Sequence, residues 1–222
     1  MKNKAKSTFY HIDFSFDELR LGGSAFAQSR GFVGSDVPTV KNPDYFRDAF
    51  NAVQELVNRG LLLAGHDISA GGLITTLLEM TFANTEGGMD ICLDKFAQND
   101  LVKLLFAENP GVVVQVADKH KKEFKELLDE AGVGYVKLGK PAEERQIMVT
   151  FDDATYQFGI DYLRDIWYET SYLLDTKQSM NGCAKQRFEN YKQQPVEFNL
   201  RKDFEGSFAQ LGLNPDRREA SG

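Results

Sequence analysis

The alternation of hydrophobic and polar positions along the chain predicts short strands and amphipathic helices in mixed order. Period-two alternation and β-branched or continuous apolar runs predict strands at residues 10–14, 61–65, 89–93, 112–116, 135–138, 146–151 and 155–158. Helical spacing, bounded by glycine or proline, predicts helices at residues 25–29, 43–60, 73–82, 100–108 and 119–131. Because strands and helices do not alternate strictly, we expect an α+β domain rather than a doubly wound sheet.

The same pattern predicts which side of an element is buried. In the first strand, Tyr10, Ile12 and Phe14 alternate with His11 and Asp13, which we expect on its polar side. The buried stripe expected for the helix that begins at Pro43 consists of Phe46, Phe50, Val53 and Val57.

From residue 160 the pattern changes to one long helix, followed beyond Gly182 by a shorter, more polar helix that runs to about residue 191. The apolar face expected for the long helix consists of Tyr162, Ile166, Trp167, Thr170 and Leu174. We interpret Trp167 as an anchor of this face rather than a ligand-binding residue. From Pro195 onward no clear period remains, so we expect residues 195–222 to be poorly ordered.

Composition narrows the class of protein. A chain of 222 residues is long enough for one well-buried core and a small appendage. Its net charge of −7 argues against nucleic-acid binding, which depends on clustered lysine and arginine. The lysines at residues 119–125 alternate with acidic residues, a pattern typical of a solvated helix face.

Cysteine usage and hydropathy indicate a cytoplasmic protein. The two cysteines lie far apart and no secretion signal precedes them, so we expect reduced thiols. No apolar stretch approaches the roughly 20 residues that span a bilayer. We therefore expect neither a membrane nor a nucleic acid among the partners.

Residues 66–72, which read His-Asp-Ile-Ser-Ala-Gly-Gly, lie at a predicted junction between a strand and a helix. The free N–H groups and dipole of a first helical turn favour anions, and glycines allow a phosphate to approach closely. Asp67 is suited to hold a magnesium ion that bridges phosphate oxygens, and Ser69 to donate to a phosphate. The competing interpretation is structural: Ser69 caps the helix, the glycines form a tight turn and His66 is a satisfied structural residue.

This motif and several others resemble, in the same order, the second synthetase half of the large, single-chain phosphoribosylformylglycinamidine synthases. These glutamine-dependent enzymes catalyse the fourth step of purine synthesis. The matching segments are residues 21–28, 63–83, 88–91, 105–108, 111–116, 167–172 and 183–188. The resemblance runs from about residue 9 to residue 191 and so covers nearly the whole chain.

The resemblance implies a three-layer α/β/α fold like the carboxy-terminal domain of aminoimidazole ribonucleotide synthetase. It divides the chain into a domain at residues 8–159, a helical extension at 160–194 and a linker toward a glutaminase at 195–222. Cys92 lies in a predicted strand and Cys183 in a charged helical region, so neither fits the tight elbow of a glutaminase nucleophile. We therefore expect the glutaminase and the preceding synthetase domains to lie outside this chain.

The activity implied is an ATP-dependent ligation in which the amide oxygen of formylglycinamide ribonucleotide is activated as an iminophosphate and ammonia from glutamine displaces the phosphate. By motif position, Asp67 resembles a Mg²⁺ ligand and Ser69 a contact to ATP or ADP. Glu79 and Glu108 recur in matched segments, but as helix glutamates they are expected at the surface or in ion pairs. Ala70 departs from the family, which usually has aspartate there, so metal occupancy or nucleotide affinity is expected to differ.

The partners implied are formylglycinamide ribonucleotide, ATP and the neighbouring domains of the same protein. Because half of each nucleotide site is expected from the preceding domain, we predict no synthetase activity for this chain alone. One alternative is a noncatalytic scaffold in which a bound nucleotide is structural and the domain docks the glutaminase. Another is a domain from a related ATP-dependent kinase of the same superfamily, such as a selenophosphate or thiamine-phosphate kinase relative, although the segment at 167–172 resembles the amidotransferase specifically.

Overall fold

The computed structural model describes residues 1–222 except 3–5, 194–202, 204 and 213–222. Within these residues, seven strands form one mixed sheet in the order β2-β4-β1-β5-β3-β6-β7, in which β3 and β6 are parallel and the other neighbours antiparallel. The strands are β1 (Ser7–Asp13), β2 (Leu62–Asp67), β3 (Gly88–Cys92), β4 (Gly111–Ala117), β5 (Tyr135–Ala142), β6 (Gln146–Phe151) and β7 (Ala154–Gly159).

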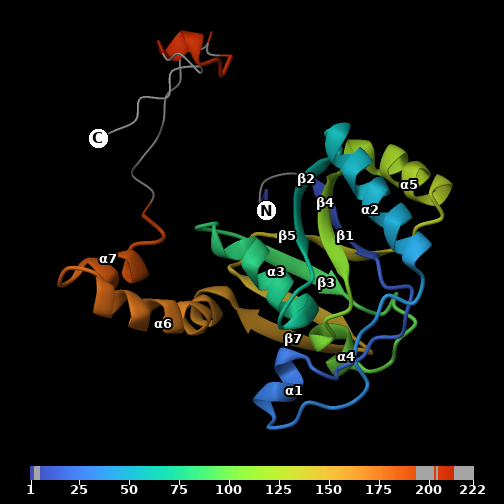
Figure 1. Ribbon diagram of the computed structural model, residues 1–222, viewed down its shortest axis with the longest axis horizontal. Helices are drawn as coiled ribbons and strands as arrows, with labels where there is room; N and C mark the ends of the chain where they lie inside the picture. Colours follow the sequence, from blue (N-terminus) through green and yellow to red (C-terminus); the bar gives the residue numbers. More distant parts are fainter. Residues whose placement is uncertain (3–5, 194–202, 204, 213–222) are drawn as a thin grey trace, which may run out of the picture.

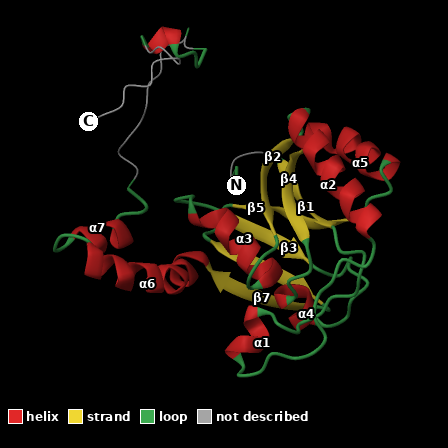
Figure 2. Ribbon diagram, viewed as in Figure 1, coloured by secondary structure: helices red, strands yellow, loops and turns green. Residues whose placement is uncertain are grey.

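Helices cover both faces of this sheet (Figures 1 and 2). One face packs against α2 (Pro43–Asn58) and α5 (Lys121–Glu130), and the other against α3 (Gly72–Phe82), α4 (Leu101–Phe106) and the start of α6 (Ile160–Gln178). The shorter elements are α1 (Ala25–Ser29), η1 (Asp118–His120), α7 (Cys183–Glu189) and η2 (Ala209–Leu211). The predicted α+β class and three-layer α/β/α arrangement are therefore confirmed.

Strand β1 lies inside the sheet, between β4 and β5, and contributes to both cores. Phe9 belongs to the core beneath α3, whereas Tyr10 and Ile12 belong to the core beneath α2 and α5. The prediction that His11 lies on a polar side of this strand is wrong, because its side chain is buried. A strand covered by helices on both faces buries both of its alternating sets of side chains.

The buried face of α2 also differs from the predicted stripe. The fully buried residues of this helix are Ala49, Ala52 and Leu56, whereas Phe50 and Val57 remain about half exposed. Small side chains allow the helix to approach the sheet closely, so the larger residues of the predicted stripe, Phe46, Phe50, Val53 and Val57, lie to the side of the contact or outside it.

The long helix α6 shows a larger difference. Its buried residues are Ile160 and Arg164, while Tyr162, Ile166 and Leu174 of the predicted apolar face are more than half exposed. The guanidinium of Arg164 lies 3.9 Å from the ring centroid of Tyr191 and also over the rings of Tyr168 and Phe188. The buried side of α6 is therefore occupied by an arginine stacked on aromatic rings, whereas the apolar pattern predicted hydrophobic side chains there.

Strand β2 lies at the edge of the sheet and extends two residues further than predicted, so that it ends at Asp67. It is half exposed rather than buried, because β4 is its one neighbour in the sheet. The predicted linker at 195–222 lies largely outside the described residues. None of the described helices is both long and apolar enough to cross a bilayer.

Candidate functional site

The turn between β2 and α3 is fixed by its two glycines. Gly71 and Gly72 both have positive φ, +90° and +70°. A Cβ on Gly72 would lie 2.7 Å from the Leu105 carbonyl oxygen and from the backbone of Phe106, at the end of α4. Close packing of α3 against α4 therefore explains Gly72, and it holds the segment ahead of the helix in one conformation.

Ser69 does not cap α3. The N-cap residue is Gly71, which has no side chain to accept a capping hydrogen bond from the first turn of the helix. Ser69 instead contributes to the turn through its backbone carbonyl, which accepts a hydrogen bond from Gly72 N–H at 3.0 Å. Its side chain is exposed, and no hydrogen bond to its hydroxyl occurs among the described residues. The capping interpretation is wrong, so the hydroxyl is available to a ligand.

Asp67 ends the edge strand with its side chain 74% exposed. Its backbone carbonyl accepts hydrogen bonds from the Thr76 hydroxyl of α3, at 3.1 Å, and from His66 Nδ1, at 2.7 Å. Among the described residues, the carboxylate itself pairs with His66 Nδ1, at 3.5 Å. A fixed backbone thus presents a carboxylate to solvent.

His66 links Asp67 to the helical extension. Its Nε2 lies 3.2 Å from one carboxylate oxygen of Glu79 in α3, and the other oxygen of Glu79 accepts a hydrogen bond from Trp167 Nε1 at 2.8 Å. Both ring nitrogens of His66 therefore face oxygen acceptors, although a neutral imidazole donates from only one of them. Trp167 contacts the Phe82 ring and Glu79 of α3 while remaining 51% exposed, so it joins α6 to α3 rather than anchoring a buried apolar face of α6.

Glu108 connects two loops at the same end of the sheet. The sequence interpretation placed it in a helix, but α4 ends at Phe106 and Glu108 follows in a loop. Its Oε1 accepts hydrogen bonds from Gly71 N–H at 2.7 Å and from Ala25 N–H at 2.8 Å. The N–H of Gly71 is therefore already hydrogen-bonded to a carboxylate, and Glu108 acts as a positioning residue. In the sequence, Glu108 stood out only because it lies in a segment that resembles the family.

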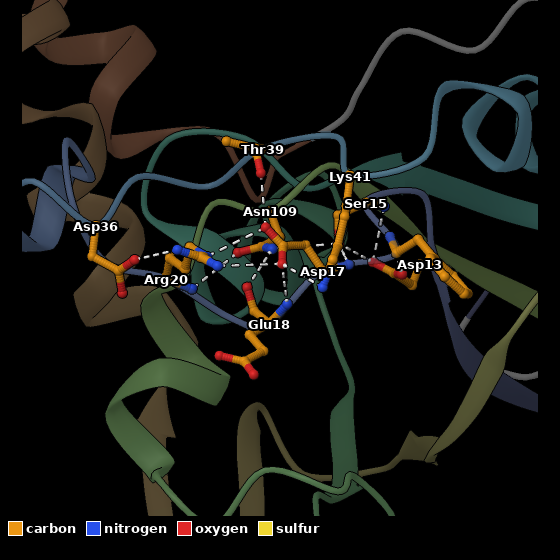
Figure 3. Close-up of polar contacts among 10 residues, drawn as sticks. Asp13, Ser15, Asp17, Glu18, Arg20, Asp36, Thr39, Lys41 and Asn109 are labelled. Carbon is orange, nitrogen blue, oxygen red and sulfur yellow. Dashed lines mark hydrogen bonds and ion pairs between the residues drawn. The ribbon is translucent and has the colours of Figure 1, made fainter.

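A polar network lies along the loop that precedes α1 (Figure 3). The buried side chain of Asn109 accepts a hydrogen bond from Arg20 N–H and donates to the Glu18 carbonyl oxygen. Arg20 also pairs with Asp17 and Asp36. Hydrogen bonds, first from the Thr39 hydroxyl, lower the pKa of Asp17. In the same loop, Gly22 N–H donates to the Asp36 carbonyl oxygen at 2.8 Å and Gly23 N–H to the Val33 carbonyl oxygen at 2.6 Å.

The metal-binding capacity of the site is partial. No group of three or more histidine, cysteine, aspartate or glutamate side chains within the described ranges is arranged to hold a metal ion. Asp67 is a hard oxygen ligand of the kind that Mg²⁺ prefers, and such sites commonly use one or two carboxylates with water and phosphate oxygens. This turn can therefore supply one protein ligand, Asp67, to a magnesium ion, and the remaining ligands would come from outside this chain.

Comparison with known proteins places the chain in a family. The family described as AIR synthase related protein, C-terminal domain, matches residues 15–152. Phosphoribosylformylglycinamidine synthase of Homo sapiens is 33% identical over 179 residues, and a probable phosphoribosylformylglycinamidine synthase, chloroplastic/mitochondrial, of Arabidopsis thaliana is 34% identical over 184 residues. These matches cover 78% and 82% of this chain but 13% of each relative.

Solved structures share the fold. A structure described as T. maritima PurL complexed with ATP has a TM-score of 0.57 and 14% identity, covering 73% of this chain and 26% of that one. A second, T. maritima PurL complexed with FGAR, has a TM-score of 0.57 and 17% identity, covering 73% and 28%. The chain therefore belongs to the AIR synthase related protein family, as its C-terminal domain, and its similarity to phosphoribosylformylglycinamidine synthases extends over about four-fifths of its length.

Proposed function

We propose that this chain is a domain of an ATP-dependent, glutamine-dependent ligase that converts formylglycinamide ribonucleotide to formylglycinamidine ribonucleotide in purine biosynthesis. The names of its relatives support the reaction, and the chain spans 13% of their length, which supports the role of one domain among several. In this proposal Asp67 is a Mg²⁺ ligand and Ser69 contacts ATP or ADP. The chain alone is inactive, because the remaining ligands come from neighbouring domains.

The observation that carries this proposal is the exposed Asp67 carboxylate on a rigid turn. The backbone of residues 67–72 is held by Thr76, by Glu108 and by packing of Gly72 against α4. The Asp67 carboxylate and the Ser69 hydroxyl are nevertheless exposed and serve no structural purpose that would explain their positions. Preorganised polar groups that the fold does not use are a feature of ligand sites.

The contribution of these residues is positioning and charge. A bound magnesium ion supplies neutralisation of phosphate charge. Asp67 would orient that ion, and the Ser69 hydroxyl would donate to a phosphate oxygen. His66 Nδ1 and the Thr76 hydroxyl contact the Asp67 backbone carbonyl, so the backbone from which the carboxylate projects is already ordered before binding.

Ala70 modifies the expected strength of this site. It stands exposed on the same turn, where the family usually has aspartate. One negative charge fewer beside the phosphates weakens the attraction for a divalent cation and also reduces repulsion of the nucleotide. We infer that nucleotide affinity here depends less on magnesium than it would with aspartate at position 70.

The test uses the complete protein that contains this chain. Asp67→Ala is expected to deplete bound nucleotide and to abolish ATP-dependent amidation with glutamine and with ammonia, whereas Asp48→Ala, an exposed carboxylate on α2, serves as the matched control. Ser69→Ala is expected to weaken nucleotide binding about tenfold through the loss of one hydrogen bond. Undiminished nucleotide content in a folded Asp67→Ala enzyme would contradict the site assignment.

A structural scaffold is the second candidate, and the exposed side of α6 favours it. Tyr162, Ile166 and Leu174 present an apolar surface that the described residues do not cover. In this case Asp67→Ala would lose nucleotide and stability but keep turnover. Under either candidate, we propose that the chain divides into a domain at 8–159, an extension at 160–194 and a linker at 195–222. We also propose that the extension docks a glutaminase and that the protein is cytoplasmic.

A further inference from the structure

The helices on one face of the sheet leave part of that face open. Helices α2 and α5 cover a core built from β1, β2, β4 and β5, and among the described residues no side chain of β3, β6 or β7 belongs to it. A cavity of about 690 Å³ lies over these three strands instead, beside the start of α5. Sites for small ligands commonly have volumes of roughly 300–1,000 Å³. None of residues 66–72 lines this cavity, so it is separate from the candidate nucleotide site.

Positive charge predominates in this cavity. Four of its lining residues are lysines and two are aspartates, which leaves an excess of two positive charges. The lysines are Lys95 in the loop after β3, Lys121 at the start of α5, and Lys137 and Lys140 in β5. The chain as a whole has a net charge of −7, so the local excess is opposite in sign to that of the protein.

Two of the four lysines have aspartate partners. Lys121 Nζ lies 2.8 Å from the Asp118 carboxylate. Lys140 Nζ lies 3.9 Å from the Asp90 carboxylate, a distance at the outer limit of an ion pair. In the part of the chain that the structure describes, Lys95 and Lys137 make no ion pair, and both are exposed. Their ammonium groups are therefore available to an anion from solution.

The register of the sheet explains why Lys137 lacks a carboxylate partner. Lys137 lies opposite Tyr10 of β1, whereas Lys140 lies opposite Asp90 of β3. Directly opposite residues are the closest cross-strand neighbours in an antiparallel pair, so Asp90 serves Lys140. Thr150 of β6 and Thr155 of β7 line the same cavity, and their hydroxyls are donors that suit an oxyanion.

We propose that this cavity binds a small multivalent oxyanion through Lys95, Lys137 and Lys140. Phosphate and carboxylate oxygens both accept hydrogen bonds from ammonium groups, and such charge-assisted bonds are among the stronger hydrogen bonds in proteins. An anion with two or more negative charges is favoured over a monovalent one, because it balances the excess charge and pairs with more than one lysine. This site is independent of the proposed function at Asp67.

The first experiment is a calorimetric titration of the chain with pyrophosphate and, separately, with citrate, in buffer without divalent cations. We expect one anion to bind per chain, more weakly as salt is added, because salt screens exposed charges. The anion that binds more tightly shows whether the cavity prefers phosphate or carboxylate groups.

A pair of matched lysine variants tests the location of this binding. Lys137→Gln removes one charge at an exposed position of the cavity and is expected to weaken binding about tenfold. Lys122→Gln removes the same charge from α5, where its side chain is 88% exposed outside the cavity. This control should change the affinity by less than about twofold.

Cys92 provides a second, local measurement. Its partly buried thiol lines the cavity, whereas the other cysteine, Cys183, lies in α7. In a Cys183→Ser background, a bound anion is expected to protect Cys92 from iodoacetamide, a neutral reagent that does not compete for the lysines. If Cys92 does not react, the calorimetric comparison of the two lysine variants decides alone.

Three results would overturn the proposal: no saturable binding of either anion to the folded chain, equal affinity in Lys137→Gln, or an equal loss in Lys122→Gln. Binding that leaves a reactive Cys92 unprotected would also count against it, because the anion would then lie elsewhere. Loss of binding in Asp67→Asn would assign the anion to the candidate nucleotide site, which overturns this proposal and leaves the proposed function intact.

Discussion

The α/β body (residues 7–159) and the helical extension (α6 and α7) distribute polarity in opposite ways. The body buries two apolar cores and leaves polar side chains such as Asp67 at its rim. The extension buries Arg164 among aromatic rings and exposes Tyr162 and Leu174. The body thus has two apolar cores of its own, although Phe32, Val33 and Val57 remain more than half exposed, whereas α6 buries few apolar residues and its exposed apolar side is typical of a surface that another protein part covers. We therefore expect a mutation in the extension to destabilise the extension with little effect on the body.

The largest expected effect is in the body, at Gly72. Gly72→Ala combines an unfavourable positive φ with a Cβ that would lie 2.7 Å from α4 backbone atoms. We expect the free energy of unfolding to fall by about 4 kcal/mol, measured by urea denaturation. Gly60→Ala is the matched control, because Gly60 also has positive φ, +65°, but open space around it, so a loss of about 1 kcal/mol is expected. Equal losses in both variants would show that packing at Gly72 is not tight.

The second effect concerns His11 and tests whether the body buries this polar side chain. The unfolded histidine titrates near pH 6.5 and the folded one near pH 4 because of burial. Between these values the unfolded chain binds more protons, so stability decreases as pH falls from about 6.5 to about 4, by roughly 3 kcal/mol in total. His11→Leu should show a shallower decrease in urea titrations over this range. An identical pH dependence in the variant would mean that His11 is not buried in the folded chain.

The third effect tests the extension. Arg164→Ala removes the stacked guanidinium and its hydrogen bond to the Phe188 carbonyl oxygen, at 2.9 Å. We expect a local loss of about 2 kcal/mol, seen as faster amide hydrogen exchange in α6 and α7 with little change in the body. Lys185→Ala in α7, which removes an exposed ion pair with Glu189, should cost less than about 0.5 kcal/mol. Faster exchange throughout the sheet in Arg164→Ala would contradict the separation of the two regions.

The smallest effect on stability is expected at the rim. Asp67→Asn removes an exposed charge that, in the part of the chain that the structure describes, pairs only with His66, so the free energy of unfolding should change by less than about 0.5 kcal/mol. A larger loss, measured by urea denaturation without nucleotide, would indicate that Asp67 belongs to the structure of the body. A negligible loss would leave ligand binding as the reason for its position.

Helices and strands could be predicted from the sequence because each depends on local periodicity. The strand at 146–151 and the helix at 25–29 match their predicted bounds, and helix 73–82 differs by one residue. The faces of α2 and α6 could not be predicted. Burial of Ala49 and Arg164 depends on how closely a helix approaches its neighbours and on which rings surround a cation, and neither is encoded by apolar spacing.

The candidate site shows the same division. Asp67 and Ser69 were identified from a contiguous motif, and the structure adds that Ser69 is not a helix cap. The roles of Glu79 and Glu108 required contacts between residues 13 to 88 positions apart in the chain, which no local pattern reveals. His11 was missed for a related reason, because burial of a polar residue depends on its strand lying inside a sheet covered on both faces.

The sequence by itself determined the elements, the α+β class and the residues at the turn after β2, because hydrogen-bonding periodicity and motif spacing act over a few residues. Tertiary structure alone decided which helix faces are buried, which glutamates position the turn, and that His11 is buried. These depend on the order β2-β4-β1-β5-β3-β6-β7, which brings distant segments together through packing of the whole sheet.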